Sequence, residues 1–286
     1  MSLEVRPYSV GKFEKSVMEL NKKAWVLFKY NKDYEHQKMS CVLNEDGNLI
    51  AVGYLRHGLS EDHNVMEVVI EVNQEAFERF SEVRKVLYPS LINICYALRN
   101  PEKKTKMVVW NDFDGDRAFY EENGFNDYQT YYFANRMINR KSLAEIEAPI
   151  GVKVRHHLMK TEDERMSYVS LENQYYNGVV YWSLNMLEWM IAGPELQTIS
   201  AFEGDEMVGS VTCWQTGAID RLFVIPRWRN KGLGKYLIAK AFDYHLANGR
   251  TNVQTLVNDL NIEGKQLLES MGYRFPDKME LLARDI

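Results

Sequence analysis

The residues best suited to bind an anion are the basic side chains of the segment 224–235, which contains no acid. These are Arg227, Arg229, Lys231 and Lys235. Gly232 and Gly234 lie among them, and glycine lets the backbone approach a ligand closely because it has no Cβ. The run 219–225 before the turn predicts a strand, and 235–248 after it predicts an amphipathic helix. A strand, a basic glycine-containing turn and a helix N-terminus are together typical of phosphate binding.

Two familiar phosphate-binding motifs do not fit this spacing. The P-loop requires a serine or threonine directly after its lysine, and Lys235 is followed by Tyr236. The dinucleotide fingerprint requires a third glycine, and Leu237 stands in its place. The segment is therefore neither a P-loop nor a dinucleotide-binding turn.

The segment resembles the acetyl-CoA loop of the GNAT N-acetyltransferase superfamily, Val-x-Pro-x-x-Arg/Gln-x-x-Gly-x-Gly/Ala. Val224, Pro226, Arg229, Gly232 and Gly234 fill its specified places in order. The resemblance implies acetyl-CoA as cosubstrate, with its pyrophosphate on the amides of the turn and its acetyl carbonyl on the main chain of the preceding strand. The residues that it assigns to the cosubstrate are Leu222, Phe223, Val224, Arg229, Asn230, Lys231, Gly232, Leu233, Gly234, Lys235 and Asn261.

Asp220 is the candidate general base. A strand period of two residues places Asp220, Leu222 and Val224 on one face. The resemblance implies a carboxylate at this position, which would take the proton of the attacking amine. A salt bridge with Arg221 explains an aspartate at a strand end equally well, so both interpretations stay open.

A second segment, 257–273, resembles the family's Asn-x-x-Ala-x-x-Leu-Tyr-x-x-x-Gly-Phe. The resemblance implies that Asn261 contacts the pantetheine arm. Leu268 stands where the family has the tyrosine that protonates the leaving thiolate, and leucine has no proton to donate. Water, another side chain or Tyr273 must take that role, or the thiolate leaves unassisted.

The acceptor side is marked by a tyrosine-rich stretch, 172–182. Its candidate substrate-binding residues are Glu172, Tyr176 and Tyr181, because tyrosine offers a flat apolar face with a polar tip. Aromatic clusters usually pack in a core, which is the simpler explanation for most of this stretch. For Glu172 the simpler explanation is a solvated acid on a helix.

Composition limits the class of protein. The chain has 286 residues, 45% of them hydrophobic, and a net charge of −5, which argues against nucleic acid as a partner. No apolar run approaches the roughly 18–20 residues of a membrane span, and no signal peptide is evident at the N-terminus. Cys41, Cys95 and Cys213 are scattered, which predicts free thiols, no metal site and a cytoplasmic location.

The chain contains an internal repeat. The strand opening at 3–6 recurs at 152–155, and the Gly-aromatic segment 122–125 recurs at 270–273. Each half predicts a helix (11–25 and 161–175), then two antiparallel strands around a turn (44–48 and 203–205). A further strand, a long helix, another strand, a short helix and a hairpin follow.

We therefore expect an α/β (α+β) fold with two GNAT-like domains, each a mixed, mostly antiparallel sheet flanked by helices. The predicted domains are 1–140, a linker 141–151, and an acetyl-CoA-binding domain 152–286. The first domain lacks a CoA loop, because no glycine occurs between Gly58 and Gly115 and acids such as Glu75 replace the basic turn. Tyr120, at its motif tyrosine, is predicted to be a packing residue.

The predicted function is direct transfer of an acetyl or short acyl group from CoA to a primary amine of a small molecule or peptide. No nucleic acid or membrane partner is expected, and the oligomeric state stays open. One alternative is a non-catalytic acyl-CoA sensor or interaction module. Another, by similarity, is a tandem acyltransferase of the mycothiol synthase kind.

Overall fold

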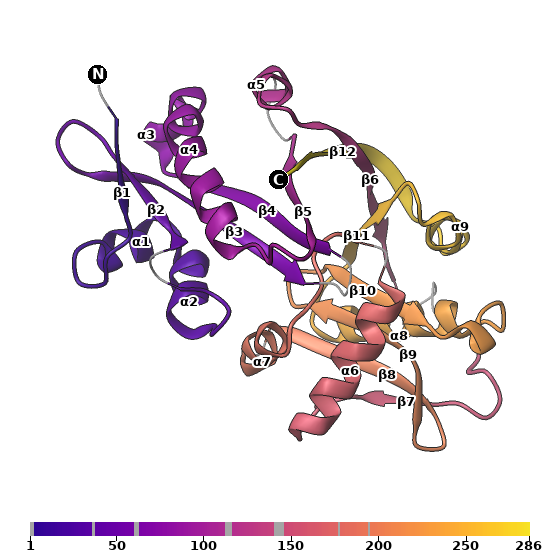
Figure 1. Ribbon diagram of the computed structural model, residues 1–286. Helices are drawn as coiled ribbons and strands as arrows, with labels where there is room; N and C mark the ends of the chain where they lie inside the picture. The colour runs from indigo at the N-terminus through magenta and orange to yellow at the C-terminus, as the bar shows by residue number, and fades with distance from the viewer. Residues whose placement is uncertain are drawn as a thin grey trace. The chain divides into compact units, whose positions relative to one another are not determined.

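The computed structural model describes residues 3–35, 38–59, 63–111, 116–139, 146–176, 178–193 and 195–286. The chain forms two compact units (Figure 1). Unit 1 comprises Met1–Tyr128, Val179–Met186 and Leu281–Ile286, and unit 2 comprises Gln129–Gly178 and Leu187–Glu280. Each unit therefore contains segments from both predicted halves. Part of the predicted linker, 141–145, lies outside the described residues.

Unit 1 is a sheet with helices. Its strands follow the order β1-β2-β3-β4-β5-β12: β1 (Glu4–Pro7), β2 (Ser40–Leu43), β3 (Leu49–Leu59), β4 (His63–Val72), β5 (Lys104–Trp110) and the end of β12 (Arg274–Asp285). Its helices are α1 (Glu14–Leu20), α2 (Lys22–Tyr30), α3 (Gln74–Phe77), α4 (Phe80–Leu98) and α5 (Asp116–Glu122). Neighbouring strands are antiparallel except β4 and β5, which pair in parallel.

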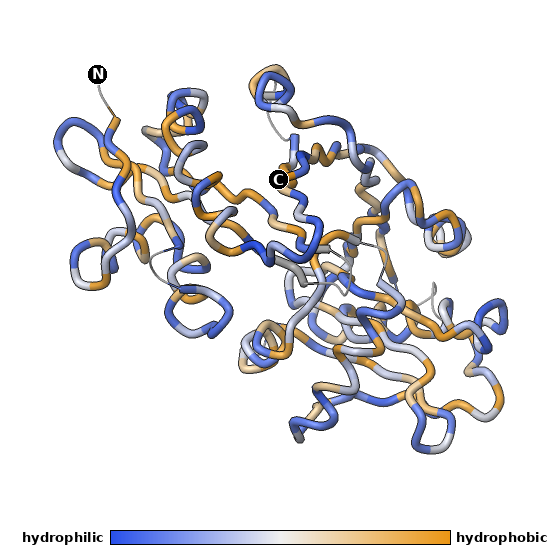
Figure 2. Tube along the Cα trace, in the orientation of Figure 1, coloured by the Kyte–Doolittle hydropathy of each residue, from blue (hydrophilic) through white to orange (hydrophobic). Residues whose placement is uncertain are grey.

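The core of unit 1 forms where α4 packs on the sheet. Leu87 and Leu91 of α4 are fully buried and lie within 3.5 Å of an ideal Cβ at Gly53 of β3, so this glycine allows a close approach of helix and strand. Hydrophobic residues are concentrated along the strands of this unit (Figure 2). Tyr120 is buried against Phe125, which confirms its predicted packing role.

Two local predictions were wrong, one in the first half and one at the end of both halves. A single helix was expected over 11–25, but Asn21 has an extended backbone and its side chain accepts a hydrogen bond of 3.0 Å from Ala24 N–H. Asn21 thus ends α1 and caps α2, since asparagine is a favourable N-cap. The hairpin expected at the end of each half is a single long strand, β6 (Asn126–Met137) or β12.

Unit 2 carries the basic turn. Its four-stranded sheet has the order β10-β9-β8-β7 and is antiparallel throughout: β7 (Lys153–His156), β8 (Leu196–Glu203), β9 (Glu206–Trp214) and β10 (Ile219–Val224). A second group of strands places β6 between β12 and β11 (Asn252–Asn258). Its helical segments are α6 (Glu162–Tyr175), α7 (Leu184–Ala192) from Leu187 onward, η3 (Pro226–Trp228), α8 (Leu233–Ala247) and α9 (Ile262–Ser270).

The predicted elements around the turn are confirmed. The capping box between Thr161 and Glu164 fixes the start of α6. On α8, Leu233, Leu237 and Phe242 are fully buried in the core of unit 2. A Cβ at Gly209 of β9 would lie 3.2 Å from Leu237, so the absence of a side chain there lets α8 pack closely on the sheet.

Candidate active site

A gap between β10 and β11 is the central feature of unit 2. The two strands belong to different sheets, and a single parallel bridge, Ala218↔Gln254, joins them among the described residues. Ile225 N–H donates to Val208 C=O at 3.0 Å, which fixes the alternation of hydrogen bonds with β9. Because antiparallel pairs alternate, the N–H groups of Leu222 and Val224 point away from β9, into the gap.

A β-bulge lies at the start of β10. The register with β9 shifts between Ile219 and Leu222. At this point Arg221 N–H donates to the hydroxyl of Thr212 at 3.0 Å. A bulge bends its strand and redirects side chains, so Asp220 stands where the direction of β10 changes.

The turn after β10 ends in an uncapped helix N-terminus. Asn230 (φ 58°) and Gly232 (φ 83°) have left-handed backbones, which asparagine and glycine tolerate best. The first hydrogen bond of α8 runs from Tyr236 N–H to Gly232 C=O, so the N–H groups of 233–235 precede the helical ladder. These donors coincide with the positive end of the helix dipole and suit an anion.

Glycine is required at positions 232 and 234 for different structural reasons. An ideal Cβ at Gly232 meets no atom within 4 Å, so its left-handed φ is what requires glycine. An ideal Cβ at Gly234 lies 3.1 Å from Leu267 Cδ2, so a side chain there would crowd α9. One glycine shapes the turn, and the other lets α8 approach α9.

Only some of the basic residues remain available to a ligand. Arg227 forms hydrogen-bonded ion pairs with Glu206 at 2.6 Å and Glu203 at 3.0 Å, which raise the pKa of its guanidinium. Its charge is therefore neutralised by the β8–β9 hairpin. Arg229 Nε donates to Val224 C=O at 3.1 Å, while Lys231 and Lys235 are exposed.

Asn261 acts as a helix cap. Its side-chain oxygen accepts a hydrogen bond of 2.9 Å from Gly264 N–H at the start of α9. An ideal Cβ at Gly264 would lie 2.6 Å from the Asn261 side chain, which explains a glycine where the family motif has alanine. Asn261 N–H in turn donates to the Asn258 side chain at the end of β11, at 2.9 Å.

Asp220 is partly exposed and has two neighbours. Its carboxylate accepts a hydrogen bond of 3.1 Å from Trp214 Nε1, and it lies 4.0 Å from Arg221 Nε. The predicted contact with Arg221 therefore exists, but it is long. Trp214 had not been predicted, because nothing in the sequence pairs a residue of β9 with one of β10 across a bulge.

Glu172 is not the solvated acid that was expected. Its side chain is 2% exposed, and Oε1 accepts a hydrogen bond of 3.0 Å from Arg221 Nη1, whose side chain is 5% exposed. Burial raises the pKa of Glu172, and Arg221 opposes that rise. The ring of Tyr176 lies 3.5 Å from the guanidinium carbon and covers it.

Two of the three candidate acceptor residues come together in unit 2. Glu172 and Tyr176 meet around Arg221 in unit 2. Tyr181 belongs to the segment Val179–Met186 of unit 1, where Asp33 accepts hydrogen bonds from Ser183 and Asn185.

Tyr273, the candidate proton donor near the end of the family motif, is buried, as is Leu268. Leu268 is buried in the core of unit 2. Tyr273 is 5% exposed and packs against Phe242, and its hydroxyl has no hydrogen-bond partner in the described part of the chain. Burial raises the pKa of this hydroxyl. His245, on α8, is likewise fully buried, as expected of a core histidine.

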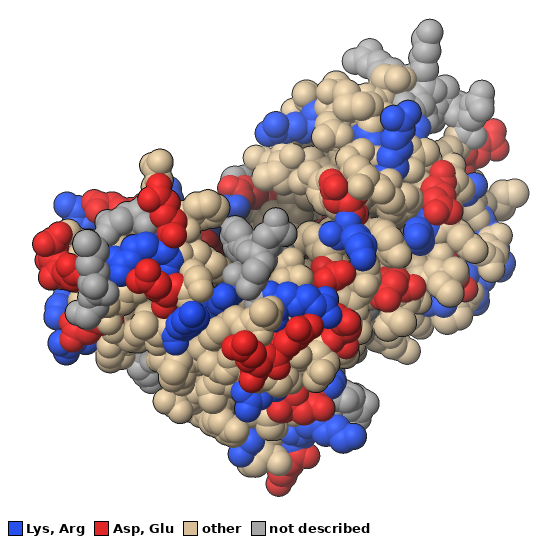
Figure 3. Space-filling model, turned by 90° about the horizontal axis from the view of Figure 1, so that it is seen from above, with Lys and Arg blue, Asp and Glu red and all other residues tan. Residues whose placement is uncertain are grey.

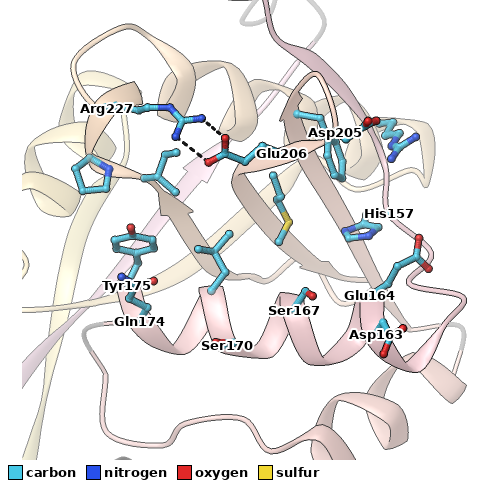
Figure 4. Close-up of a pocket in the computed structure, with 16 residues that line it drawn as sticks. His157, Asp163, Glu164, Ser167, Ser170, Gln174, Tyr175, Asp205, Glu206 and Arg227 are labelled. Atoms are coloured by element: carbon cyan, nitrogen blue, oxygen red, sulfur yellow. Dashed lines mark hydrogen bonds and ion pairs between the residues drawn. The ribbon is translucent and has the colours of Figure 1, made fainter.

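A second concavity lies on the other side of the turn. It has a volume of about 900 Å³ between α6 and the β8–β9 hairpin (Figure 4). It reaches Pro226 and Arg227 but none of the residues 229–235. Arg227 and Glu206 bond to each other at its rim, and burial lowers the pKa of His157 in its wall. The groove is thus lined partly by polar and charged side chains and borders the start of the turn.

The surface charge is mixed, and the described residues contain neither a membrane-spanning helix nor a group of metal-binding side chains. On the face drawn in Figure 3, basic and acidic side chains are interspersed. Within the described ranges, no helix is long and apolar enough to cross a membrane. The same residues contain no group of three or more His, Cys, Asp or Glu side chains placed to hold a metal ion.

The corresponding strands of unit 1 are paired at their start. There β4 and β5 form a parallel ladder from His63↔Lys104 to Glu67↔Val108. The end of β4, 68–72, lies beyond this ladder and leads into an acidic segment without glycine.

Comparison with known proteins relates part of the chain to one family. Residues 158–273 match the model of the Acetyltransferase (GNAT) family. An uncharacterized N-acetyltransferase of Archaeoglobus fulgidus is 28% identical over 103 residues, covering 32% of this chain and 70% of the relative.

Solved structures share the fold over nearly the whole chain. A GCN5-related N-acetyltransferase from Sphaerobacter thermophilus has a TM-score of 0.66 at 14% identity, covering 99% of this chain and 95% of its own. A tandem GNAT protein from the clavulanic acid biosynthesis pathway has a TM-score of 0.65 at 14% identity, covering 99% and 98%. Residues 158–273 thus match the GNAT acetyltransferase family, and the chain shares the fold of solved GNAT structures.

Proposed function

We propose that unit 2 binds acetyl-CoA along the open edge of β10 and transfers its acetyl group, or a related short acyl group, directly to a primary amine. One observation carries this proposal: β10 and β11 separate after the single bridge Ala218↔Gln254, beside a turn that ends in an uncapped helix. The gap exposes main-chain donors, and the turn exposes a positive helix end. Together they suit a long ligand with a polar arm and a phosphate group.

The turn holds the pyrophosphate in this proposal. The N–H groups of Leu233, Gly234 and Lys235 donate to it, and the exposed cations Lys231 and Lys235 offset its charge. Asn230 and Gly232 supply the left-handed backbone that turns those donors toward one point. Arg229 has a different part, because its bond to Val224 C=O ties the turn to the strand end.

The gap holds the arm and the thioester. Main-chain groups of 222–224 bind there, and the N–H of Leu222 or Val224 stabilises the negative charge that develops on the acetyl oxygen. Asn261 keeps α9 in place at the end of β11, and its amide nitrogen faces the same arm in the family pattern.

Asp220 takes the proton from the amine. It is the partly exposed carboxylate at the bulge, and Trp214 holds one of its oxygens at 3.1 Å. The amine attacks the thioester carbonyl, the carbon–sulfur bond breaks, and the thiolate departs with a proton from water. We assign that last proton to water because Leu268 has none and Tyr273 is buried.

We propose that the first half, residues 1–140, retains the fold without the cosubstrate site, while 152–286 contains it. The segment after β4 supports this assignment, because it has acids such as Glu75 and no glycine where the second half has a basic glycine-containing turn. The first half nonetheless contributes β6, which pairs with β11 from Tyr131↔Asn258 to Met137↔Asn252.

One observation favours a second candidate, a non-catalytic acyl-CoA sensor. The family's proton-donating tyrosine is replaced by Leu268, and the nearby Tyr273 hydroxyl is buried. A sensor would bind acetyl-CoA with the same residues but would turn over no amine, and its affinity would not respond to Asp220→Asn.

Acetyl-CoA binding, measured by calorimetry, tests the proposed function. Micromolar affinity corresponds to roughly −8 kcal/mol, and Gly232→Glu should remove most of it by placing a carboxylate beside the pyrophosphate. Gly232→Gln is the matched control, since it has the same backbone strain and shape without the charge. We expect Gly232→Glu to bind far more weakly than Gly232→Gln. If the wild-type protein itself does not bind, the proposal is wrong.

A further inference from the structure

The end of β10 opposite the turn carries a net negative charge. Three charged side chains lie together at the bulge: Asp220, Arg221 and Glu172. Two are acids and one is a base, so their sum is −1. The single cation is engaged, because Glu172 holds it at 3.0 Å and the ring of Tyr176 covers it at 3.5 Å. Asp220 is therefore the charge that a ligand meets at this end.

A buried oxygen at the same place has no partner. Glu172 is 2% exposed, and its Oε2 accepts no hydrogen bond from any residue that the structure describes. An unpartnered buried carboxylate oxygen is unfavourable, and a donor such as an ammonium group would satisfy it. The bulge thus presents the exposed carboxylate of Asp220 to an incoming N–H group, and the buried carboxylate of Glu172 adds negative charge behind it.

Charge reverses along β10. At the turn, Lys231 and Lys235 are exposed, and Arg227 is neutralised by Glu203 and Glu206. At the bulge, four residues before the end of the strand or about 13 Å away, the charge is negative. The strand therefore has one end that attracts phosphate and another that attracts a cation.

We propose that the acceptor is a cationic amine without a neighbouring carboxylate, such as a diamine, a polyamine or an aminosugar. This inference rests on the proposed function and narrows its substrate class. An α-amino acid would bring its carboxylate beside Asp220 and Glu172, and like charges at such distances repel. A diamine brings only ammonium groups, which the exposed Asp220 binds, with the buried charge of Glu172 behind it.

Matched probe pairs test the inference. Putrescine and ornithine, and cadaverine and lysine, share a chain and a terminal amine and differ by one carboxylate. Calorimetry on the wild-type protein saturated with CoA gives a dissociation constant for each. We expect the diamine of each pair to bind at least about tenfold more tightly. Asp220→Asn should weaken binding of the diamine more than binding of the amino acid, and so reduce the ratio of their dissociation constants.

The outcomes separate the two proposals. Equal binding of both members, tighter binding of the amino acid, or binding of neither member overturns the inference. CoA binding is measured first on the same protein, so its loss would instead contradict the proposed function. Glu172→Gln is a second variant, and its side-chain amide can still accept a hydrogen bond from Arg221. It should also reduce the preference for the diamine over the amino acid if the carboxylate charge causes that preference.

Discussion

Glu172 Oε1 accepts a hydrogen bond of 3.0 Å from Arg221 Nη1, and both side chains are almost completely buried in unit 2. The pair links α6 to the bulge of β10. A buried charge is tolerated only with a partner, so each residue depends on the other for its place in the core. The bulge that positions Asp220 is thereby anchored to a helix.

Breaking this pair should destabilise the protein strongly. Glu172→Ala leaves the guanidinium of Arg221 buried without a counter-charge, which costs about 3–5 kcal/mol of unfolding free energy. The double variant Glu172→Leu/Arg221→Met should recover most of that loss, because it removes both charges. Urea denaturation of the three proteins measures the difference. Equal stability of Glu172→Ala and wild type would contradict the role of the pair.

Asp220→Asn should separate binding from chemistry. A lost general base lowers the turnover rate by about 10²- to 10⁴-fold. Acetyl-CoA affinity should stay unchanged, because the turn that holds the pyrophosphate lies at the other end of β10. Thiol release with putrescine measures turnover, and calorimetry measures affinity. An unchanged turnover would remove Asp220 from the mechanism.

Arg227 and Lys235 should differ although both lie in the basic segment. Lys235→Ala should weaken acetyl-CoA binding by about tenfold, since a hydrogen bond to a charged group contributes about 1.5–3 kcal/mol. Arg227→Ala is its control and should have little effect, because Glu203 and Glu206 already engage that guanidinium. The reverse order of effects, measured by calorimetry, would refute the assigned contacts.

The end of β12 should be essential to the stability of unit 1. Leu282 is fully buried there and pairs with Val109 of β5. Leu282→Ala should lower the free energy of unfolding by about 2–5 kcal/mol through the cavity it leaves. Met137→Ala, at a 69% exposed position of β6, is a control that should have little effect. Thermal unfolding compares the two variants.

His245 should make stability depend on pH. Burial, reinforced by Arg250, lowers its pKa to about 4 in the folded protein. The unfolded chain, with an ordinary histidine pKa near 6.5, therefore binds the proton first as the pH falls. This group's contribution is fully present above about pH 6.5, and about 3 kcal/mol of stability is lost between there and pH 4. His245→Leu should flatten that part of the profile, as denaturation at several pH values would reveal.

Local patterns in the sequence predicted the elements but not their side-chain partners. The capping box of Thr161 and Glu164 and the left-handed turn at Gly232 involve residues close in sequence, so the types present were informative. The GNAT fold followed from the same turn. The position of Asn21, which separates α1 from α2, was missed because both sides of the break favour a helix.

Contacts between distant segments could not be predicted. Glu172 was expected in solvent because an acid in a polar helix gives no sign of a buried arginine 49 residues later. Arg227 was counted among the free cations of the turn, and its pairing with Glu206 depends on how the β8–β9 hairpin bends. The pairing of β6 with β11 and of β12 with β5 was missed for the same reason, since strand order depends on the tertiary fold.

The short ladder of β4 and β5 has a consequence for any attempt to give the first half a cosubstrate site. Its pairs run from His63↔Lys104 to Glu67↔Val108, so residues 68–72 of β4 lie beyond it. The segment that follows them, 73–80, contains acids and no glycine. Several neighbouring residues would therefore have to change together before a phosphate could bind there, because a single added glycine would leave the acids in place.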